Sequence, residues 1–359
     1  MLRLLIVDDS ALMRKCLGEI FKAEGDFQVS FARNGAEALT LAGTNTYDVI
    51  TLDVNMPEMD GITCLSRIMV ECPKPVVMVS SITTEKAEVT LQALSLGAVD
   101  FVPKPDGTVS LHINKIRGQL VSKVRNAASA RVQNRRGLLE RVRYRNASTE
   151  VQRRSETRVR NLATSAAGPI GGVVLIGVST GGPSAVEAVL PLLRADFPWP
   201  IIIAQHMPKS FTGVFARRLN DLSAIEVVEV ARAMPLRAGV AYVGRGDADI
   251  LIGMRNGALA AIPFPASQQH LWHPSVERLV ASALEHVAPE QLVGVMLTGM
   301  GNDGAVTMTE LRARGGRTIA ESEDTAVVWG MPGELVKRGG ASMVLPIQRI
   351  ADQLRRWTN

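Results

Sequence analysis

The sequence predicts an α/β protein of two domains, each built around a parallel sheet. Short apolar runs of strand length alternate along the chain with segments whose apolar residues keep a helical period. Several of these runs end in acidic, hydroxyl or glycine-rich residues, as strands do when they deliver side chains to one edge of a parallel sheet. A length of 359 residues exceeds what one core ordinarily supports, so we expect two bodies.

Residues 1–120 form the first predicted domain. We expect its strands at Leu2–Val7, Phe27–Ala32, Asp48–Leu52, Pro75–Val79 and Val99–Val102. Segments of helical period separate them, among them Ala11–Ala23, Ala36–Ala42 and Glu85–Leu96. This βα repeat predicts a parallel sheet wound by helices.

Charged and hydroxyl side chains stand where these strands end, namely Asp8, Asp9, Asp53, Ser80 and Lys104. Any one of them alone could be a solvated strand end or a helix cap. Three carboxylates brought together repel one another unless a cation joins them, so a hard, oxygen-binding ion such as Mg²⁺ is expected at this edge. Asp53 would be the exposed member that can attack phosphorus.

Residues 1–120 resemble a response-regulator receiver domain, which has a flavodoxin-like fold with a five-stranded parallel sheet. The resemblance is carried by Asp8-Asp9, Leu52–Gly61, Ser80 and Phe101–Pro105. It implies that Asp53 accepts a phosphoryl group from a histidine kinase and that Lys104 pairs with the phosphate. Ser80 and Phe101 would be the switch residues. The implied ligands of Mg²⁺ are Asp8, Asp9 and Asp53.

Residues 121–168 form a predicted basic linker. Between Val121 and Ile170, twelve basic residues stand against three acidic ones, a net charge of +9 in a chain whose total is +5. We interpret this segment as a helix that continues out of the first domain and then frays into a solvated, flexible tether. Contact with nucleic acid or an acidic membrane is the alternative.

The composition indicates a cytoplasmic protein. Its three cysteines, Cys16, Cys64 and Cys72, are too few and too irregularly spaced for a disulfide framework or a metal site, which favours a reducing compartment. No apolar run approaches the roughly 20 residues of a membrane span, and the N-terminal run is too short for a signal peptide. We therefore expect no membrane insertion.

Residues 169–359 form the second predicted domain, which begins with a strand near Val173 and a glycine-rich turn. The segment Gly177–Gly181 fits the G-x-S-x-G pattern, in which a serine on a strained strand-to-helix turn is exposed above a sheet. Ser179 is therefore a candidate nucleophile. The alternatives are a turn with a capping serine, or a phosphate cradle at a helix N-terminus.

Two further strand ends supply the partners that a serine nucleophile needs. His206 follows the predicted strand Trp199–Ala204, and Asp303 lies in the turn after Leu292–Leu297. Nucleophile, base and orienting carboxylate on one sheet edge make a serine triad by role, and the backbone N–H groups of Thr180 and Met300 are candidate oxyanion donors. This chemistry requires no cofactor.

The order Ser, His, Asp differs from the Ser, Asp, His order of α/β-hydrolases. A hydrolase of that kind would need its acid among Asp196, Asp221, Asp247 and Asp249. Its histidine would come from His270, His273 or His286.

Residues 170–345 resemble the catalytic domain of the chemotaxis protein-glutamate methylesterases, the CheB family. The resemblance is carried by Gly177–Pro183, Gln205–Met207, His273–Val276, Leu297–Gly304 and Gly330–Pro332. It implies a doubly wound parallel α/β domain with Ser179 as nucleophile, His206 as base and Asp303 as its orienting residue. Two places depart from the family pattern. Val243–Asp249 lacks a usual proline and histidine, and Glu321-Ser322 replaces a Gln-Asp pair.

Together the two resemblances imply a phosphorylation-regulated hydrolase. It would demethylate glutamate methyl esters on methyl-accepting chemoreceptors and deamidate certain glutamines, with a histidine kinase as phosphodonor. The unphosphorylated receiver is expected to lie over the catalytic cleft. One alternative is a response regulator with a non-catalytic binding output, which for DNA would need a helix-turn-helix that we do not find, so no specific nucleic acid is expected. Another is a nucleotide site at the glycine turn, but neither G-x-G-x-x-G nor G-K-[ST] follows Gly177.

Overall fold

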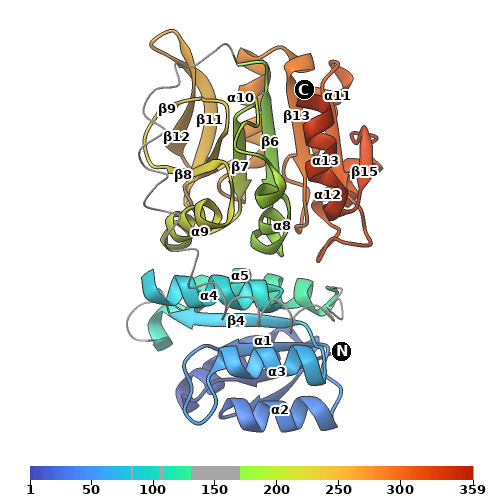
Figure 1. The fold of residues 1–359 in the computed structure, drawn as a ribbon. Coiled ribbons are helices and arrows are strands. Elements are labelled where there is room, and N and C mark those ends of the chain that lie inside the picture. The colour runs from blue at the N-terminus through green and yellow to red at the C-terminus, as the bar shows by residue number, and fades with distance from the viewer. Residues whose placement is uncertain (82–83, 105–108, 131–169, 359) are drawn as a thin grey trace.

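The computed structural model describes residues 1–81, 84–104, 109–130 and 170–358. In this part of the chain two α/β bodies are stacked on one another (Figure 1). The N-terminal body holds a five-stranded sheet and the C-terminal body a seven-stranded one. Residues 131–168 of the predicted linker lie outside the described residues. No described helix is both long and apolar enough to cross a membrane.

The N-terminal body has the predicted βα order. Its elements are β1 (Leu2–Val7), α1 (Ala11–Glu24), β2 (Phe27–Ala32), α2 (Gly35–Thr44), β3 (Val49–Asp53), α3 (Gly61–Glu71), β4 (Val76–Ser81), α4 (Thr84–Leu96), β5 (Asp100–Lys104) and α5 (Val109–Ala128). All pairs in the strand order β2-β1-β3-β4-β5 are parallel, which confirms the flavodoxin-like sheet. Because the strands are parallel, their carboxyl ends meet at one edge.

Local sequence explains where the helices of this body begin. Ser10, Asn34 and Asp60 are N-caps of α1, α2 and α3, and each accepts a hydrogen bond from a main-chain N–H in the first turn. Helix α5 continues past residue 120, because Val121 and Val124 are buried in the core beside Leu4 of β1. Residues 121–128, the first of the predicted linker, therefore belong to this helix.

The C-terminal body is organised around a second parallel sheet. Its strands are β6 (Val173–Val178), β7 (Ile201–Gln205), β8 (Glu226–Val230), β10 (Val240–Gly244), β13 (Leu292–Met296), β14 (Arg317–Glu321) and β15 (Met343–Leu345). The strand order is β15-β14-β13-β6-β7-β10-β8, and all six neighbouring pairs are parallel. Its helices are α8 (Gly182–Val189), α9 (Lys209–Leu222), α10 (Val276–His286), α11 (Ala305–Ala313), α12 (Met331–Lys337) and α13 (Ile347–Thr358).

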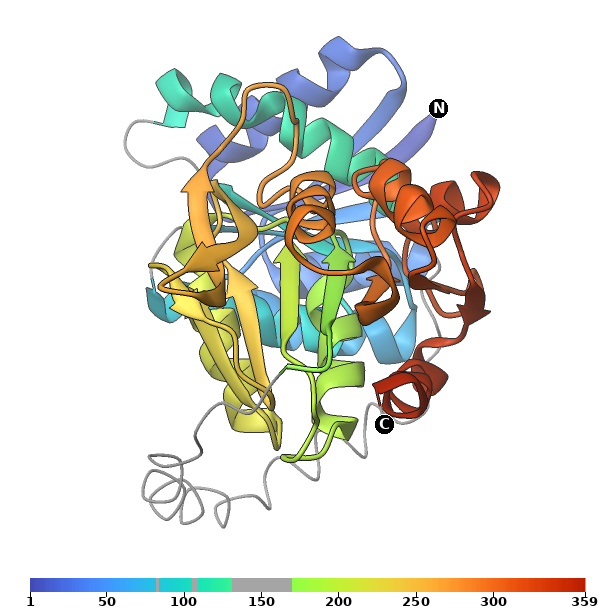
Figure 2. The same ribbon diagram turned by 90° about the horizontal axis from the view of Figure 1, so that it is seen from above.

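Helices cover both faces of this sheet, as predicted for a doubly wound domain. Alternate residues of β6 enter different cores: Val174 and Ile176 pack with α8, α9 and α13, whereas Val173 and Leu175 pack with α10. Helix α13 lies along the flank of the body, against α8 and β14 (Figure 2).

A part of the C-terminal body departs from the predicted doubly wound pattern. The strands β9 (Met234–Pro235), β11 (Ala248–Arg255) and β12 (Ala258–Pro265) form a small antiparallel sheet. A two-residue turn joins β11 to β12, with both Asn256 and Gly257 at positive φ. Asn-Gly is the residue pair that such a hairpin turn favours, so a local signal for the hairpin was present in the sequence.

Candidate active site

Three central strands of the C-terminal sheet bring Ser179, His206 and Asp303 together. Ser179 directly follows β6 and His206 directly follows β7, while Asp303 lies between β13 and α11. The His206 N–H donates to the Val178 carbonyl at 3.1 Å, and the Ser179 N–H donates to the Thr298 carbonyl at 3.0 Å. Because β13, β6 and β7 are neighbours in the sheet, the three turns share one edge.

His206 and Asp303 form a buried pair. The Nε2 atom of His206 lies 2.9 Å from Oδ2 of Asp303, and the two side chains are 8% and 3% exposed. Nδ1 of His206 is also buried, and within the part of the chain that the structure describes it has no hydrogen-bond partner. The Trp272 ring lies nearly parallel to the imidazole, at 6.0 Å between centroids. Nδ1 is therefore the ring nitrogen left for a reacting group.

Asp303 is held by the N-terminus of α10 as well as by His206. Oδ2 accepts from the Val276 N–H at 2.7 Å, and Oδ1 accepts from the Glu277 N–H at 3.1 Å and from Ser275 Oγ at 3.0 Å. Burial acts to raise the pKa of Asp303, but His206 and these N–H groups outweigh it and hold the pKa below its usual value. Asp303 thus stays ionised and can orient the imidazole.

An oxyanion donor must have no other hydrogen-bond acceptor, a requirement that applies here to the N–H groups of Thr180 and Met300. Neither donates to a backbone carbonyl among the described residues. Gly181, at φ 76°, supports the turn after Ser179 in a conformation that favours glycine. At Gly299 a Cβ atom would lie 2.8 Å from the Cβ of Ser179, so glycine lets the two turns approach each other closely.

Gln205 and Ser275 are site residues for which sequence reasoning assigned no role. Nε2 of Gln205 donates to the Ser179 carbonyl at 3.0 Å and to the His206 carbonyl at 3.1 Å, so it joins the two turns. Ser275 caps α10 and donates to Asp303. Both lie in segments that the sequence singled out, but their contacts depend on strands that meet only in the folded chain.

Two candidates for the alternative order of a serine hydrolase, the buried Asp249 and the partly exposed His273, also form a pair. Asp249 accepts from Nδ1 of His273 at 2.8 Å and from the Ser275 N–H at 2.7 Å, and it forms an ion pair with Arg278. Its oxygens are thereby occupied in anchoring the start of α10. His206, by contrast, is the histidine whose main chain is hydrogen-bonded to β6, next to Ser179.

A surface groove of about 710 Å³ opens beside Met300. It runs between the turn after β13 and the start of α12, and Gly301, Trp329 and Lys337 are among its lining residues. A side chain entering along this groove would reach the turn that carries one of the two candidate oxyanion donors.

The acidic edge of the N-terminal body is also assembled as predicted. Carboxylate oxygens of Asp8, Asp9 and Asp53 lie within 4.8 Å of one another. Lys104 Nζ lies 2.8 Å from Asp8 and 2.7 Å from Asp53, and Ser80 is fully buried. Three carboxylates around one point offer the oxygen donors that suit Mg²⁺.

Asp53 itself is buried, at 5% exposure, so the expectation that it is the exposed member of the cluster was wrong. It is the last residue of β3 and lies beneath Lys104, whereas Asp9 is exposed. Burial raises the pKa of Asp53, against the opposing effect of Lys104.

Comparison with known proteins separates the chain into the same two parts. Residues 174–354 match the family model described as CheB methylesterase, and residues 4–114 match the response regulator receiver domain. The chain belongs to the CheB methylesterase family.

Full-length relatives and a solved structure agree with this membership. A protein-glutamate methylesterase/protein-glutamine glutaminase of Rhodospirillum rubrum is 57% identical over 359 residues, which covers 99% of this chain and 96% of that protein. One of Rhodopseudomonas palustris is 52% identical over 361 residues and covers 100% and 99%. The crystal structure of the Thermotoga maritima CheB methylesterase catalytic domain matches 52% of this chain and 98% of its own, with 34% identity and a TM-score of 0.50.

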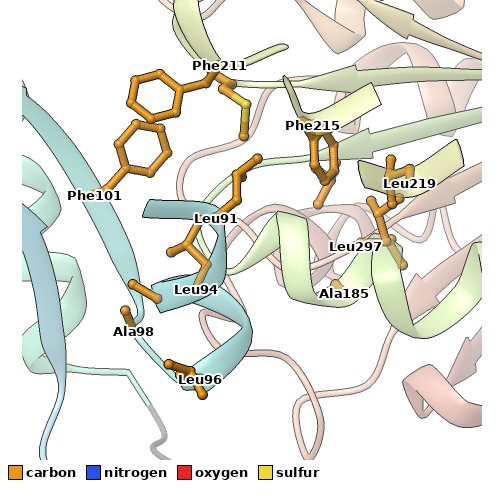
Figure 3. Packing of buried hydrophobic residues seen from close by; sticks show 14 of the residues in the cluster. Leu91, Leu94, Leu96, Ala98, Phe101, Ala185, Phe211, Phe215, Leu219 and Leu297 are labelled. Atoms are coloured by element: carbon orange, nitrogen blue, oxygen red, sulfur yellow. The ribbon is translucent and has the colours of Figure 1, made fainter. Parts of the chain in front are cut away.

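In this CheB-family chain the receiver is docked on the catalytic domain through an apolar contact. The Phe101 ring of β5 lies against Phe211 of α9, with 4.3 Å between centroids (Figure 3). Leu91 and Leu94 of α4 point toward α8 and α9, and they belong to one buried cluster with Ala185 of α8. The hydrophobic core is therefore continuous between the two bodies.

Polar contacts at the same interface reach the residue after Ser179. Thr180 Oγ1 donates to Oδ2 of Asp100 at 2.6 Å, and Oδ1 of Asp100 lies 2.7 Å from Lys123 Nζ. Ser184 Oγ donates to the Leu94 carbonyl at 2.8 Å. The docked receiver thus contacts the turn that carries the candidate nucleophile, and sequence reasoning had not singled out Asp100.

Proposed function

We propose that this chain is a phosphorylation-regulated serine esterase, which removes methyl groups from glutamate γ-methyl esters of methyl-accepting chemoreceptors and deamidates certain receptor glutamines. One observation supports this most strongly: the buried His206–Asp303 pair lies beside Ser179 at one edge of a CheB-type sheet. The names of the full-length relatives describe the same two activities.

Ser179 acts as the nucleophile and His206 as the base. Ser179 Oγ attacks the ester carbonyl carbon while its proton passes to Nδ1 of His206, and Asp303 stabilises the imidazolium from the other side of the ring. The negative charge that develops on the carbonyl oxygen is met by the Thr180 and Met300 N–H groups.

The intermediate then collapses with loss of methanol. The bond from the carbonyl carbon to the methoxy oxygen breaks, and His206 returns its proton to that oxygen. Water next attacks the acyl group on Ser179 with His206 again as base, which releases a glutamate carboxylate and restores the serine. A glutamine side chain follows the same path, except that the leaving group is ammonia. Nothing in these steps calls for a cofactor.

The receiver controls access to this chemistry. Asp53 accepts the phosphoryl group from a histidine kinase, and Lys104 pairs with the added charge. Asp8, Asp9 and Asp53 would hold Mg²⁺, which when bound neutralises the phosphoryl oxygens. Ser80 and Phe101 act as switch residues, and the position of Phe101 against Phe211 supports a switch that weakens docking directly.

The partners that follow from this proposal are a histidine kinase and chemoreceptors, and the enzyme would act in the cytoplasm. The groove beside Met300 is where we place the methyl-ester side chain. The decisive test is methanol release from methylated receptor preparations by the full-length enzyme, with and without a small phosphodonor. Folded Ser179→Ala enzyme that released methanol at the wild-type rate would contradict the serine mechanism, as would failure of a fluorophosphonate to label Ser179.

A further inference from the structure

Glu321 is a buried acid beneath the esterase site. It ends β14 and is 1% exposed. Oε2 accepts a hydrogen bond from the Thr298 N–H at 2.8 Å, and Oε1 accepts one from Thr325 Oγ1 at 3.0 Å. Its carboxyl group therefore lies between the turn that follows β13 and the loop that follows β14.

Thr298 in turn holds the nucleophile and its neighbour. Its carbonyl accepts from the Ser179 N–H at 3.0 Å, and its hydroxyl donates to the Thr180 carbonyl at 2.9 Å. Gly299 packs directly against Ser179. Any shift of the Thr298 main chain would consequently move the Ser179 hydroxyl and the Thr180 N–H together.

The loop after β14 closes back on the same turn. The Val328 N–H donates to Thr298 Oγ1 at 2.9 Å, and the Gly299 N–H donates to the Val328 carbonyl at 3.0 Å. The Trp329 indole N–H donates to the Glu321 carbonyl at 2.9 Å. Glu321 thus holds the turn after β13 through its carboxyl group and the loop after β14 through its main-chain carbonyl.

We propose that Glu321 is a positioning residue for the esterase reaction, whose carboxyl group fixes the Thr298 main chain and thereby places Ser179 and Thr180. Glu321 acts through Thr298 and does not touch the substrate. This inference rests on the proposed esterase function.

The cost of burying Glu321 supports a role beyond packing. Its carboxyl group accepts from Thr298 and Thr325, which are neutral donors, so neither provides an opposite charge. Burial raises the pKa of Glu321 to about 7, although both hydrogen bonds act in the opposite direction. An apolar residue would fill the space without this cost, but it would leave the Thr298 N–H without an acceptor.

The test compares Glu321→Asp with Glu321→Gln in the full-length enzyme. Aspartate keeps the charge but withdraws the oxygens by about 1.5 Å, the length of one carbon–carbon bond. Glutamine keeps the length and an oxygen acceptor for Thr298. We expect Glu321→Asp to lower kcat about 10- to 100-fold with KM within about threefold of wild type, because small displacements of reacting groups cost this much. Glu321→Gln should keep kcat within about threefold.

Thr318→Val is the matched structural control. Thr318 is fully buried in the same strand, and its hydroxyl bonds to the Gly340 carbonyl away from the site. We expect this variant to lose stability without losing kcat per folded molecule, with the folded fraction measured by circular dichroism. Wild-type kcat in Glu321→Asp, or an equal loss of kcat in Glu321→Gln, would overturn the proposal.

A second variant and a second readout keep the test decisive. If Glu321→Asp does not fold, Thr325→Val removes the other anchor of the carboxyl group. It should lower kcat about three- to tenfold, and an unchanged kcat would overturn the proposal. The rate at which a fluorophosphonate labels Ser179 should fall in parallel. Labelling needs no receptor, so it separates the two proposals. A wild-type enzyme that is labelled but releases no methanol would refute the proposed substrate, and the labelling rates of the variants would still show whether Glu321 positions Ser179.

Discussion

The hydroxyl of Thr180 donates a 2.6 Å hydrogen bond to Asp100, which joins the residue after the candidate nucleophile to the last strand of the receiver. Phe101, the implied switch residue, directly follows Asp100 in the chain. Both residues are buried at the interface. A change in the position of Phe101 would therefore act on the bond to Thr180 through the main chain of β5.

Replacing Asp100 should weaken the docking of the receiver and so raise the activity of the unphosphorylated enzyme. A hydrogen bond to a charged group contributes about 1.5–3 kcal/mol, and about 1.4 kcal/mol changes the open population of a mostly closed enzyme tenfold. We expect Asp100→Ala to raise methanol release without phosphodonor about tenfold, measured at saturating receptor.

The matched control for this variant is Asp48→Ala. Asp48 is also a receiver carboxylate in an ion pair, with Arg3, but it precedes the central strand β3, whereas Asp100 begins the outer strand β5. Its loss should leave unstimulated activity within about twofold of wild type. Activity of Asp100→Ala that equals that of Asp48→Ala would show that the Thr180 contact does not restrain the enzyme.

Substitutions in the triad should act as a unit. Removing Ser179 or His206 is expected to lower kcat by about 10⁶, the loss found when the nucleophile or base of a serine triad is removed. Asp303→Asn should cost less, because the amide still fits between His206 and the start of α10. Methanol release per folded enzyme measures all three, and more than a few per cent of activity in folded Ser179→Ala would exclude this mechanism.

Much of the candidate esterase site could be predicted because its residues follow strands. An apolar run that ends in glycine, histidine or aspartate indicates a position at the carboxyl edge of a parallel sheet, and Ser179, His206 and Asp303 all lie at such positions. The strands for which the sequence analysis gave bounds agree with the structure within two residues at either end, since buried parallel strands are continuous apolar runs.

Contacts made only by tertiary packing could not be predicted in the same way. Asp100 and Thr180 are 80 positions apart, and nothing in either local sequence indicates that they meet. The burial of Asp53 under Lys104 likewise depends on how two strand ends approach each other. The hairpin at Asn256-Gly257 differs, because its turn signal was local and was overlooked within a supposed βα pattern.

Phosphorylation should act only through Asp53. Asp53→Asn removes the phosphoacceptor but keeps the length of the side chain, so the docked arrangement of Phe101 against Phe211 should persist. We expect low methanol release that does not respond to a small phosphodonor, whereas the wild-type enzyme responds. Stimulation of Asp53→Asn to the wild-type level would place the phosphoacceptor elsewhere.

The stability of the protein should fall with rising pH because of Glu321. Burial raises the pKa of Glu321 from 4.5 to about 7, so ionisation is less favourable in the folded state than in the unfolded chain. The contribution of this group is fully present below pH 4.5 and is lost as the pH rises through about 7. At about 1.4 kcal/mol for each pH unit, the loss is at most about 3 kcal/mol.

Glu321→Gln should remove this dependence, because the amide does not titrate. We expect the free energy of unfolding of Glu321→Gln, relative to that of wild type, to be higher at pH 8 than at pH 5 by up to about 3 kcal/mol, as measured by urea denaturation. Other titrating groups contribute equally to both proteins and cancel in the comparison. The same difference between variant and wild type at both pH values would mean that the Glu321 carboxyl group has the same charge in the folded and the unfolded protein over this range, and the assignment of its raised pKa would then be wrong.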